Sequence, residues 1–197
     1  MKGVWMAGLV GGIVGFLWGA ISHMVLPLGT IGIDTMPNEG PIVDAMRSLP
    51  SDGLYFFPGE GFDENPKSPA YAAWVAKLRS GPRGLLIFHP KGAEPMMPSQ
   101  LLLEFLADVG GALIAAWLLA RVVGSYAFRT TVVAALGIFA WLSISASYWI
   151  WYGFPGDYSL AQLADSFLGW LVVGLVIARM VSPPALPPAT PPTARPI

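Results

Sequence analysis

The amino-acid sequence predicts an all-α membrane protein: four transmembrane helices with a small α+β extramembrane insertion between the first and the second. Composition is the first reason, because 54% of the 197 residues are hydrophobic and only 12% are charged, against about 25% charged residues in an ordinary soluble domain. The second reason is that four apolar runs are each long enough to cross a hydrocarbon core of about 30 Å. The lipid bilayer is therefore the expected surroundings of most of the chain.

The first predicted span occupies residues 1–28, where Lys2 is the only formally charged residue. Its apolar run is longer than the roughly 7–15 residues of a signal peptide, so we expect an uncleaved anchor whose helix ends at Pro27. A stripe of small residues follows one face of this helix: Gly8, Gly12, Gly15 and Gly19. Such a stripe permits close helix contact, either within the chain or with a protein partner or a second copy in a homo-oligomer.

Residues 29–99 are polar and rich in proline and glycine, and we expect them to form an outward-facing extramembrane α+β insertion. Proline and serine signals predict helices over 41–49 and 68–79. Aromatic and branched residues predict strands over 53–57 and 83–89. Elements this short bury little surface, so the insertion is expected to pack on the membrane helices or on a partner.

The remaining predicted segments follow in order: spans over 100–121, 130–152 and 160–181, then a disordered proline-rich tail over 182–197. The third span closes in an aromatic cluster, which is typical of a membrane–water interface. The tail should stay extended, because proline-rich sequence favours solvated, extended backbone.

The basic residues outside the insertion sort to one side of the membrane. This side holds Lys2, the linker with Arg121 and Arg129, Arg179, and Arg195 of the tail, whereas the short connection that contains Asp157 lies on the other. The positive-inside rule then predicts a multi-pass protein of the cell (inner) membrane with both termini in the cytoplasm.

Several classes of function lack their sequence signals. A net charge of −1 provides no basic footprint for nucleic acid. The absence of cysteine excludes thiolate metal sites and cysteine nucleophiles. No glycine-rich phosphate loop or GxSxG motif is present, so neither an enzyme nor a cofactor is expected.

The second half of the chain, with LLLEFLADVGGALIAAWLLAR and then YWIWYGFPGDYSLAQLADSFLGW, resembles an uncharacterised family of small bacterial four-helix membrane proteins. In that family an aromatic third helix leads through a short polar turn into a last helix with an early acidic residue. The segment GFLWGAISHMVLP is similar to its first helix. The resemblance covers the four helices and not the insertion, and it implies an architecture without a site.

Four residues are candidates for an ion or proton site: His23, Glu104, Asp108 and Asp165, with Gln162 and Ser147 as neighbours. In the predicted topology all four lie at one level in the outer half of the membrane. Carboxylates and an imidazole at that level would bind a cation or relay protons. The sequence favours a structural role over both, because an acid near a helix N-terminus is stabilised by the helix dipole. Asp108 is the deepest acid and the strongest candidate.

Two weaker hypotheses use the histidines. The segment HPKGAEPMMP combines His89 with Glu94, Met96 and Met97, and Met24 follows His23. Histidine with thioether can hold copper. A haem held by two histidines would need both His23 and His89. The sequence as a whole favours an accessory or interaction subunit; a small oligomeric transporter or ion-handling protein that uses the intramembrane acids is the alternative.

Overall fold

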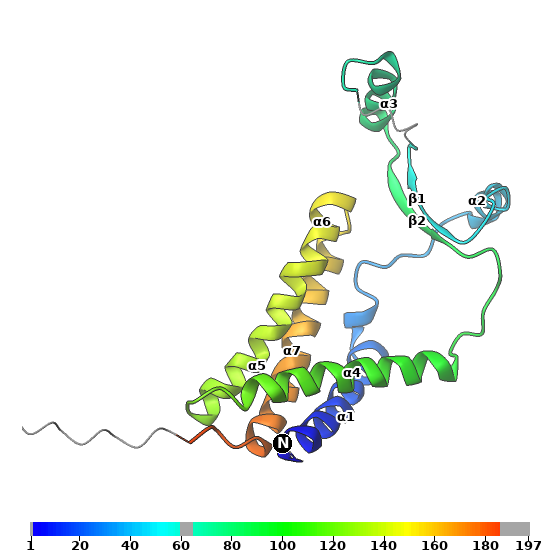
Figure 1. Ribbon diagram of the computed structural model, residues 1–197. Coiled ribbons are helices and arrows are strands. Elements are labelled where there is room, and N and C mark those ends of the chain that lie inside the picture. The colour runs from blue at the N-terminus through cyan, green and yellow to red at the C-terminus, as the bar shows by residue number, and fades with distance from the viewer. Residues whose placement is uncertain (1, 60–64, 186–197) are drawn as a thin grey trace, which may run out of the picture.

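The computed structural model describes residues 2–59 and 65–185. Within these residues, four helical segments are long and apolar enough to cross a membrane: α1 (Lys2–Met24), α4 (Pro98–Leu119), α5–η2–α6 (Tyr126–Tyr152) and α7 (Gly156–Met180). A two-stranded sheet lies between the first and second of them (Figure 1). The predicted fold class is thus confirmed, and the chain is a multi-pass membrane protein. Most of the predicted tail lies outside the described residues.

The third span is continuous in space but changes its helical geometry midway. It comprises α5 (Tyr126–Ala140), a π-helical turn η2 (Trp141–Ser145) and α6 (Ala146–Tyr152). The span begins four residues before the predicted Thr130, because the Ser125 side chain accepts a hydrogen bond of 3.2 Å from the backbone N–H of Phe128 and caps the helix.

The glycine stripe of α1 faces α4 within the same chain. A Cβ added at Gly8 would collide with Leu113, and one added at Gly12 would collide with Val109. Close approach of the two backbones therefore requires glycine at these positions. The stripe from Gly8 to Gly15 is therefore covered by α4 within the chain, as one of the two expected readings has it, and the structure does not support a homo-oligomer or partner contact through these positions.

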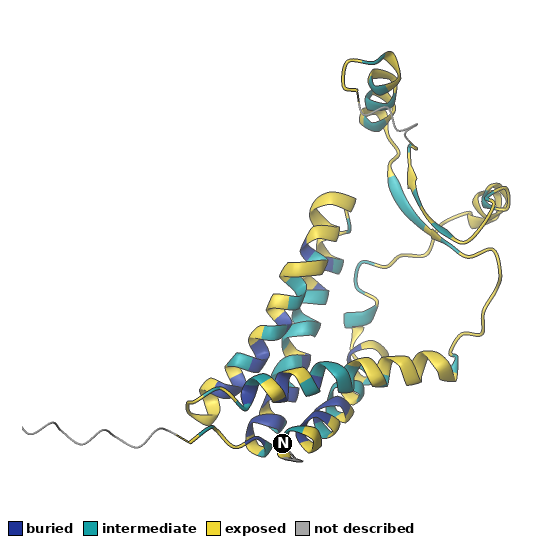
Figure 2. Cartoon of the chain, viewed as in Figure 1, coloured by how far each residue is buried: buried dark blue, intermediate teal, exposed yellow. Residues whose placement is uncertain are grey.

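The core lies at one end of the four-helix bundle (Figure 2). Leu119 of α4, Val133 of α5 and Ile177 of α7 are fully buried there, packed among alanines such as Ala7 and Ala116. From this end α5 and α7 run side by side, whereas α4 takes a different direction and leaves them (Figure 1). The helices are thus tightly packed at one end and diverge toward the other.

Arg129 corrects a sequence expectation. It lies in the first turn of α5, not in a linker, and only 3% of its surface is exposed. Its guanidinium donates hydrogen bonds to the carbonyl oxygens of Leu119 at 3.2 Å, Ala178 at 3.2 Å and Val181 at 2.7 Å. The C-terminal carbonyls of a helix carry partial negative charge, so one cation ties the ends of α4 and α7 to the start of α5.

The insertion contains α2 (Glu39–Met46), β1 (Gly53–Phe57), α3 (Pro69–Ser80) and β2 (Gly84–Phe88). The strands form an antiparallel ribbon. The start of β2 lies close to the turn between α6 and α7, where a Cβ built on Gly153 would stand 3.5 Å from a guanidinium nitrogen of Arg83. None of the described residues between 30 and 97 is buried. The insertion therefore has no core of its own in the part of the chain that the structure describes.

Candidate functional site

A cavity of about 510 Å³ opens where α4 and α7 diverge, and α1 lies between them. All four predicted site residues line it: His23 from α1, Glu104 and Asp108 from α4, and Asp165 from α7. The structure therefore brings together four side chains that are far apart in sequence. Neither of the predicted neighbours, Gln162 and Ser147, is among the lining residues.

Two of the acids, Asp165 and Asp108, lie directly beside α1. The indole Nε1 of Trp18 donates a hydrogen bond of 2.7 Å to Oδ1 of Asp165, which joins α1 to α7. One turn earlier on α1, a Cβ built on Gly15 would lie 3.3 Å from Oδ1 of Asp108. The missing side chain at Gly15 leaves room for the carboxylate of Asp108 beside α1.

Glu104 and Asp108 have no hydrogen-bond or ion-pair partner in the described part of the chain. Asp108 follows the start of α4 at Pro98 by ten residues, which is about 15 Å along a helix. A carboxylate at such a depth in hydrocarbon must be protonated, hydrated or paired with a cation. The cavity gives water or a cation access to both carboxylates.

Stabilisation by helix dipoles does not explain these acids. The first turn of α4 contains no acid, and the first-turn acid of α7 is Asp157. The dipole effect falls off within one turn, and both helices begin earlier than their predicted starts near residues 100 and 160. Glu104, Asp108 and Asp165 all lie beyond that range.

His23 lies in the last turn of α1 and stays close to its own helix. Its Nδ1 lies 2.8 Å from Oγ of Ser22 and 3.1 Å from the carbonyl oxygen of Gly19. One ring nitrogen is thereby engaged at the rim of the cavity, which orients the imidazole.

The cavity walls combine acids with aromatic and thioether groups. Phe16, Trp18 and Trp170 contribute rings, and Met24 and Met96 contribute sulfur. Among the described residues, no three His, Asp or Glu side chains stand close enough together to hold a metal ion. The arrangement suits a cation with an apolar body better than a metal centre.

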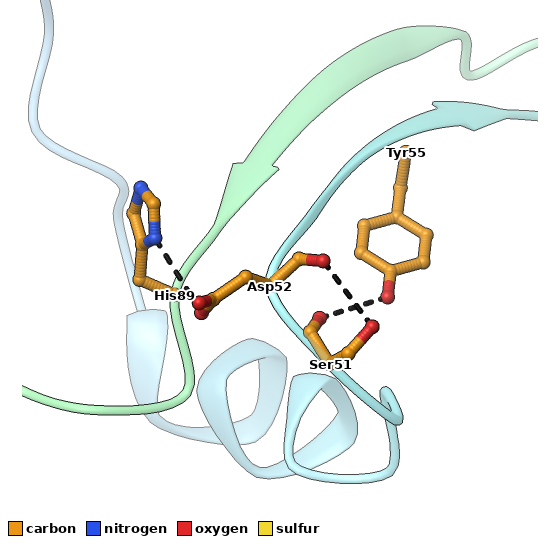
Figure 3. A network of polar contacts seen from close by, with 4 residues as sticks. All are labelled: Ser51, Asp52, Tyr55 and His89. Atoms are coloured by element: carbon orange, nitrogen blue, oxygen red, sulfur yellow. Dashed lines mark hydrogen bonds and ion pairs between the residues drawn. The ribbon is translucent and has the colours of Figure 1, made fainter.

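The second histidine belongs to the ribbon. His89 follows β2, and its Nδ1 lies 3.5 Å from Oδ1 of Asp52, with both side chains more than two-thirds exposed (Figure 3). Beside them the hydroxyl of Tyr55 donates to the carbonyl oxygen of Ser51 at 2.9 Å. His89 does not line the cavity that His23 lines, so the structure does not favour a haem held by both histidines, and the copper hypothesis gains no support from it.

Sequence reasoning missed the two tryptophans of the site. Trp18 holds Asp165, and Trp170 lies near Gly111, where an added Cβ would approach its ring to 3.0 Å. Tryptophan is common in membrane helices and at their interfaces. The position of a tryptophan in the sequence does not show which residue of another helix its indole contacts. The position of Arg129 inside the helix could have been predicted, because Ser125 is a good helix N-cap and places the helix start before Arg129.

No family model, curated protein or solved structure matches the chain. The four-span membrane architecture therefore rests on the structure itself, and the resemblance to a family of four-helix membrane proteins stays a prediction.

Proposed function

We propose that this protein is a small cation-handling membrane protein that binds an organic cation with an apolar body, such as a protonated amine, in the cavity between α1, α4 and α7. One observation carries the proposal: Glu104 and Asp108 face a shared cavity and lack partners among the described residues. A bound cation would neutralise carboxylates that are otherwise costly in a membrane.

The walls support the same class of ligand. Indole and phenyl faces attract cations, and this attraction grows when the cation is desolvated. Ligand sites between bundled helices are mostly apolar, with few polar groups that fix orientation. Because Trp18 already donates to Asp165, we assign Asp165 to positioning and the pair on α4 to cation binding. Four helices are few for alternating access, so transport would need a second copy.

The test is calorimetric titration of the detergent-solubilised full chain with tetraphenylphosphonium, and with triphenylphosphine oxide as an uncharged probe of similar shape. We expect the cation alone to bind and Asp108→Asn to weaken its binding at least about tenfold, which corresponds to about 1.4 kcal/mol. Asp157→Asn is the matched control, because Asp157 does not line the cavity. Equal binding of both probes, or unchanged affinity in Asp108→Asn, would overturn the proposal.

A second candidate function, an accessory or interaction subunit, is favoured by the insertion. Leu54 and Ile87 are 63% and 68% exposed on a ribbon that has no buried residue around it. An isolated two-stranded ribbon is marginally stable in water, and exposed apolar patches mark interaction surfaces. A protein partner that covers this ribbon would supply the missing core.

Hydrogen exchange distinguishes this candidate. We expect the amides of residues 53–57 and 84–88 to exchange at least about tenfold more slowly in native membranes than in the protein purified in detergent. A third sample, the purified protein in lipid bilayers, is the control. Protection in those bilayers would assign the cover to lipid instead of a protein, and equal exchange in all three samples would remove the candidate.

A further inference from the structure

A second hollow, the α1–α4 groove, lies on the outer surface of the helix pair near the end where α4 stops. Its volume is about 770 Å³, and its lining is apolar apart from one base: Val4, Trp5, Leu113, Ile114, Trp117, Ala120 and Arg121. The groove shares no lining residue with the acidic cavity, so the two are separate features.

The groove faces the bilayer. Trp5, Ile114 and Trp117 are 65%, 61% and 50% exposed, although all three belong to membrane-spanning helices. Apolar side chains with this exposure in a span meet lipid tails. The two indoles stand near the ends of their helices, at a depth where tryptophan prefers the membrane–water interface.

Arg121 stands at the end of the groove without a counter-ion. Its guanidinium carbon lies 3.8 Å from the centroid of the Trp117 ring, and Nη1 donates a hydrogen bond of 2.6 Å to the carbonyl oxygen of Trp117. No carboxylate among the described residues pairs with Arg121. Stacking and hydrogen bonding hold the guanidinium in place while donors remain for an external anion.

The whole end of the bundle around Arg121 lacks acids. The sequence contains no Asp or Glu before Asp34, between Asp108 and Asp157, or after Asp165. An anion bound at Arg121 is therefore repelled by no nearby acid among the described residues.

We propose that the α1–α4 groove is a binding site for one anionic phospholipid, with an acyl chain along the apolar groove and the phosphate at Arg121. Basic pockets beside transmembrane helices recognise anionic headgroups in this way, and guanidinium matches phosphate oxygens in pairs. The bilayer supplies this ligand at high local concentration, and the groove offers both an apolar and a cationic contact.

Charge argues against a second copy of the chain as the occupant. A two-fold symmetric contact through this face would bring equivalent patches together, so the two Arg121 side chains would approach each other. With no acid at this end to separate them, that contact is disfavoured.

The test uses tryptophan quenching by brominated lipids in phosphatidylcholine bilayers that contain the full chain. A fixed minor fraction of either brominated phosphatidylglycerol or brominated phosphatidylcholine is added, and the signal of Trp117 is the difference between wild type and Trp117→Phe. We expect at least threefold stronger apparent binding of the anionic lipid in wild type and no preference in Arg121→Gln.

Arg179→Gln is the matched control. Arg179 also stacks on an aromatic ring, 4.7 Å from the centroid of Tyr126, and donates to a carbonyl of its own helix, Leu175 at 3.4 Å, but it lines no part of the groove. This variant should keep the lipid preference. The proposal is overturned by equal quenching from both lipids in wild type, by an equal loss of preference in Arg179→Gln, or by quenching that disappears as protein density rises, the sign of a second copy in the groove.

Discussion

The Trp18 indole and the Asp165 carboxylate, separated by 147 positions in the sequence, meet in a hydrogen bond of 2.7 Å that joins α1 to α7. The bond occupies one oxygen of Asp165 at the edge of the cavity. A partly buried bond to a charged group is worth about 1.5–3 kcal/mol. This contact both closes one wall of the cavity and fixes the level of Asp165.

Trp18→Phe removes the donor and leaves the carboxylate of Asp165 unsatisfied. We expect a loss of about 1–3 kcal/mol in the free energy of unfolding, measured by denaturant titration in detergent micelles. Asp165→Asn retains an acceptor oxygen and should lose less. Trp151→Phe, at a side chain 75% exposed, is the control, and an equal loss in that variant would show that Trp18 has no special role.

Arg129→Lys replaces the forked guanidinium, which donates to the three carbonyls of Leu119, Ala178 and Val181, by a single ammonium group. An ammonium cannot donate along the same directions, so we expect a loss of about 1.5–3 kcal/mol in the free energy of unfolding. The exposed Arg121→Lys serves as the comparison in the same titration. A stability equal to wild type would mean that the carbonyls are satisfied without the guanidinium.

Gly12→Ala places a methyl group against Val109 at the α1–α4 contact, whereas Gly19→Ala meets nothing within 4 Å. We expect the first variant to lose about 1–3 kcal/mol through overpacking and the second to be unchanged or slightly stabilised. Thermal unfolding followed by circular dichroism compares the two. Equal behaviour would contradict the close packing of α1 on α4.

Limited trypsin digestion in detergent should cut the insertion before the membrane helices. Lys91 lies in an exposed segment, and no described residue from 30 to 97 is buried, so its backbone is open to proteolysis. Arg129 is buried within α5 and should resist. Mass spectrometry of the first fragments checks the order, and early cleavage at Arg129 would contradict the packing at that end of the bundle.

Most of the architecture could be predicted from the sequence, because long uncharged runs have few alternatives to a membrane span. The ribbon strands were predicted from aromatic and branched residues, and β1 matches its predicted range. Their pairing could not be predicted, because the register of a ribbon depends on contacts that cross a long loop. In the structure Gly53 faces Phe88 and Phe57 faces Gly84.

The candidate site was predicted in part. Charge inside a span is rare, which singles out His23, Glu104, Asp108 and Asp165, and these residues line one cavity. Their role in binding stays a prediction. The aromatic walls depend on how the helices are rotated about their axes, and the burial of Arg129 depends on α5 beginning at Tyr126, after the Ser125 cap.

The bundle is closely packed at one end only, so a small change in the angle between two helices at that end becomes a larger displacement at the other end. Leu119, Ile177 and the Arg129 hydrogen bonds lie at the pivot, and the 25 residues of α7 form an arm about 37 Å long at 1.5 Å per residue. Each degree of rotation at the pivot moves the far end of that arm by about 0.6 Å. A substitution at Leu119, Ile177 or Arg129, none of which lines the cavity, would therefore change the spacing of α4 and α7 at the cavity.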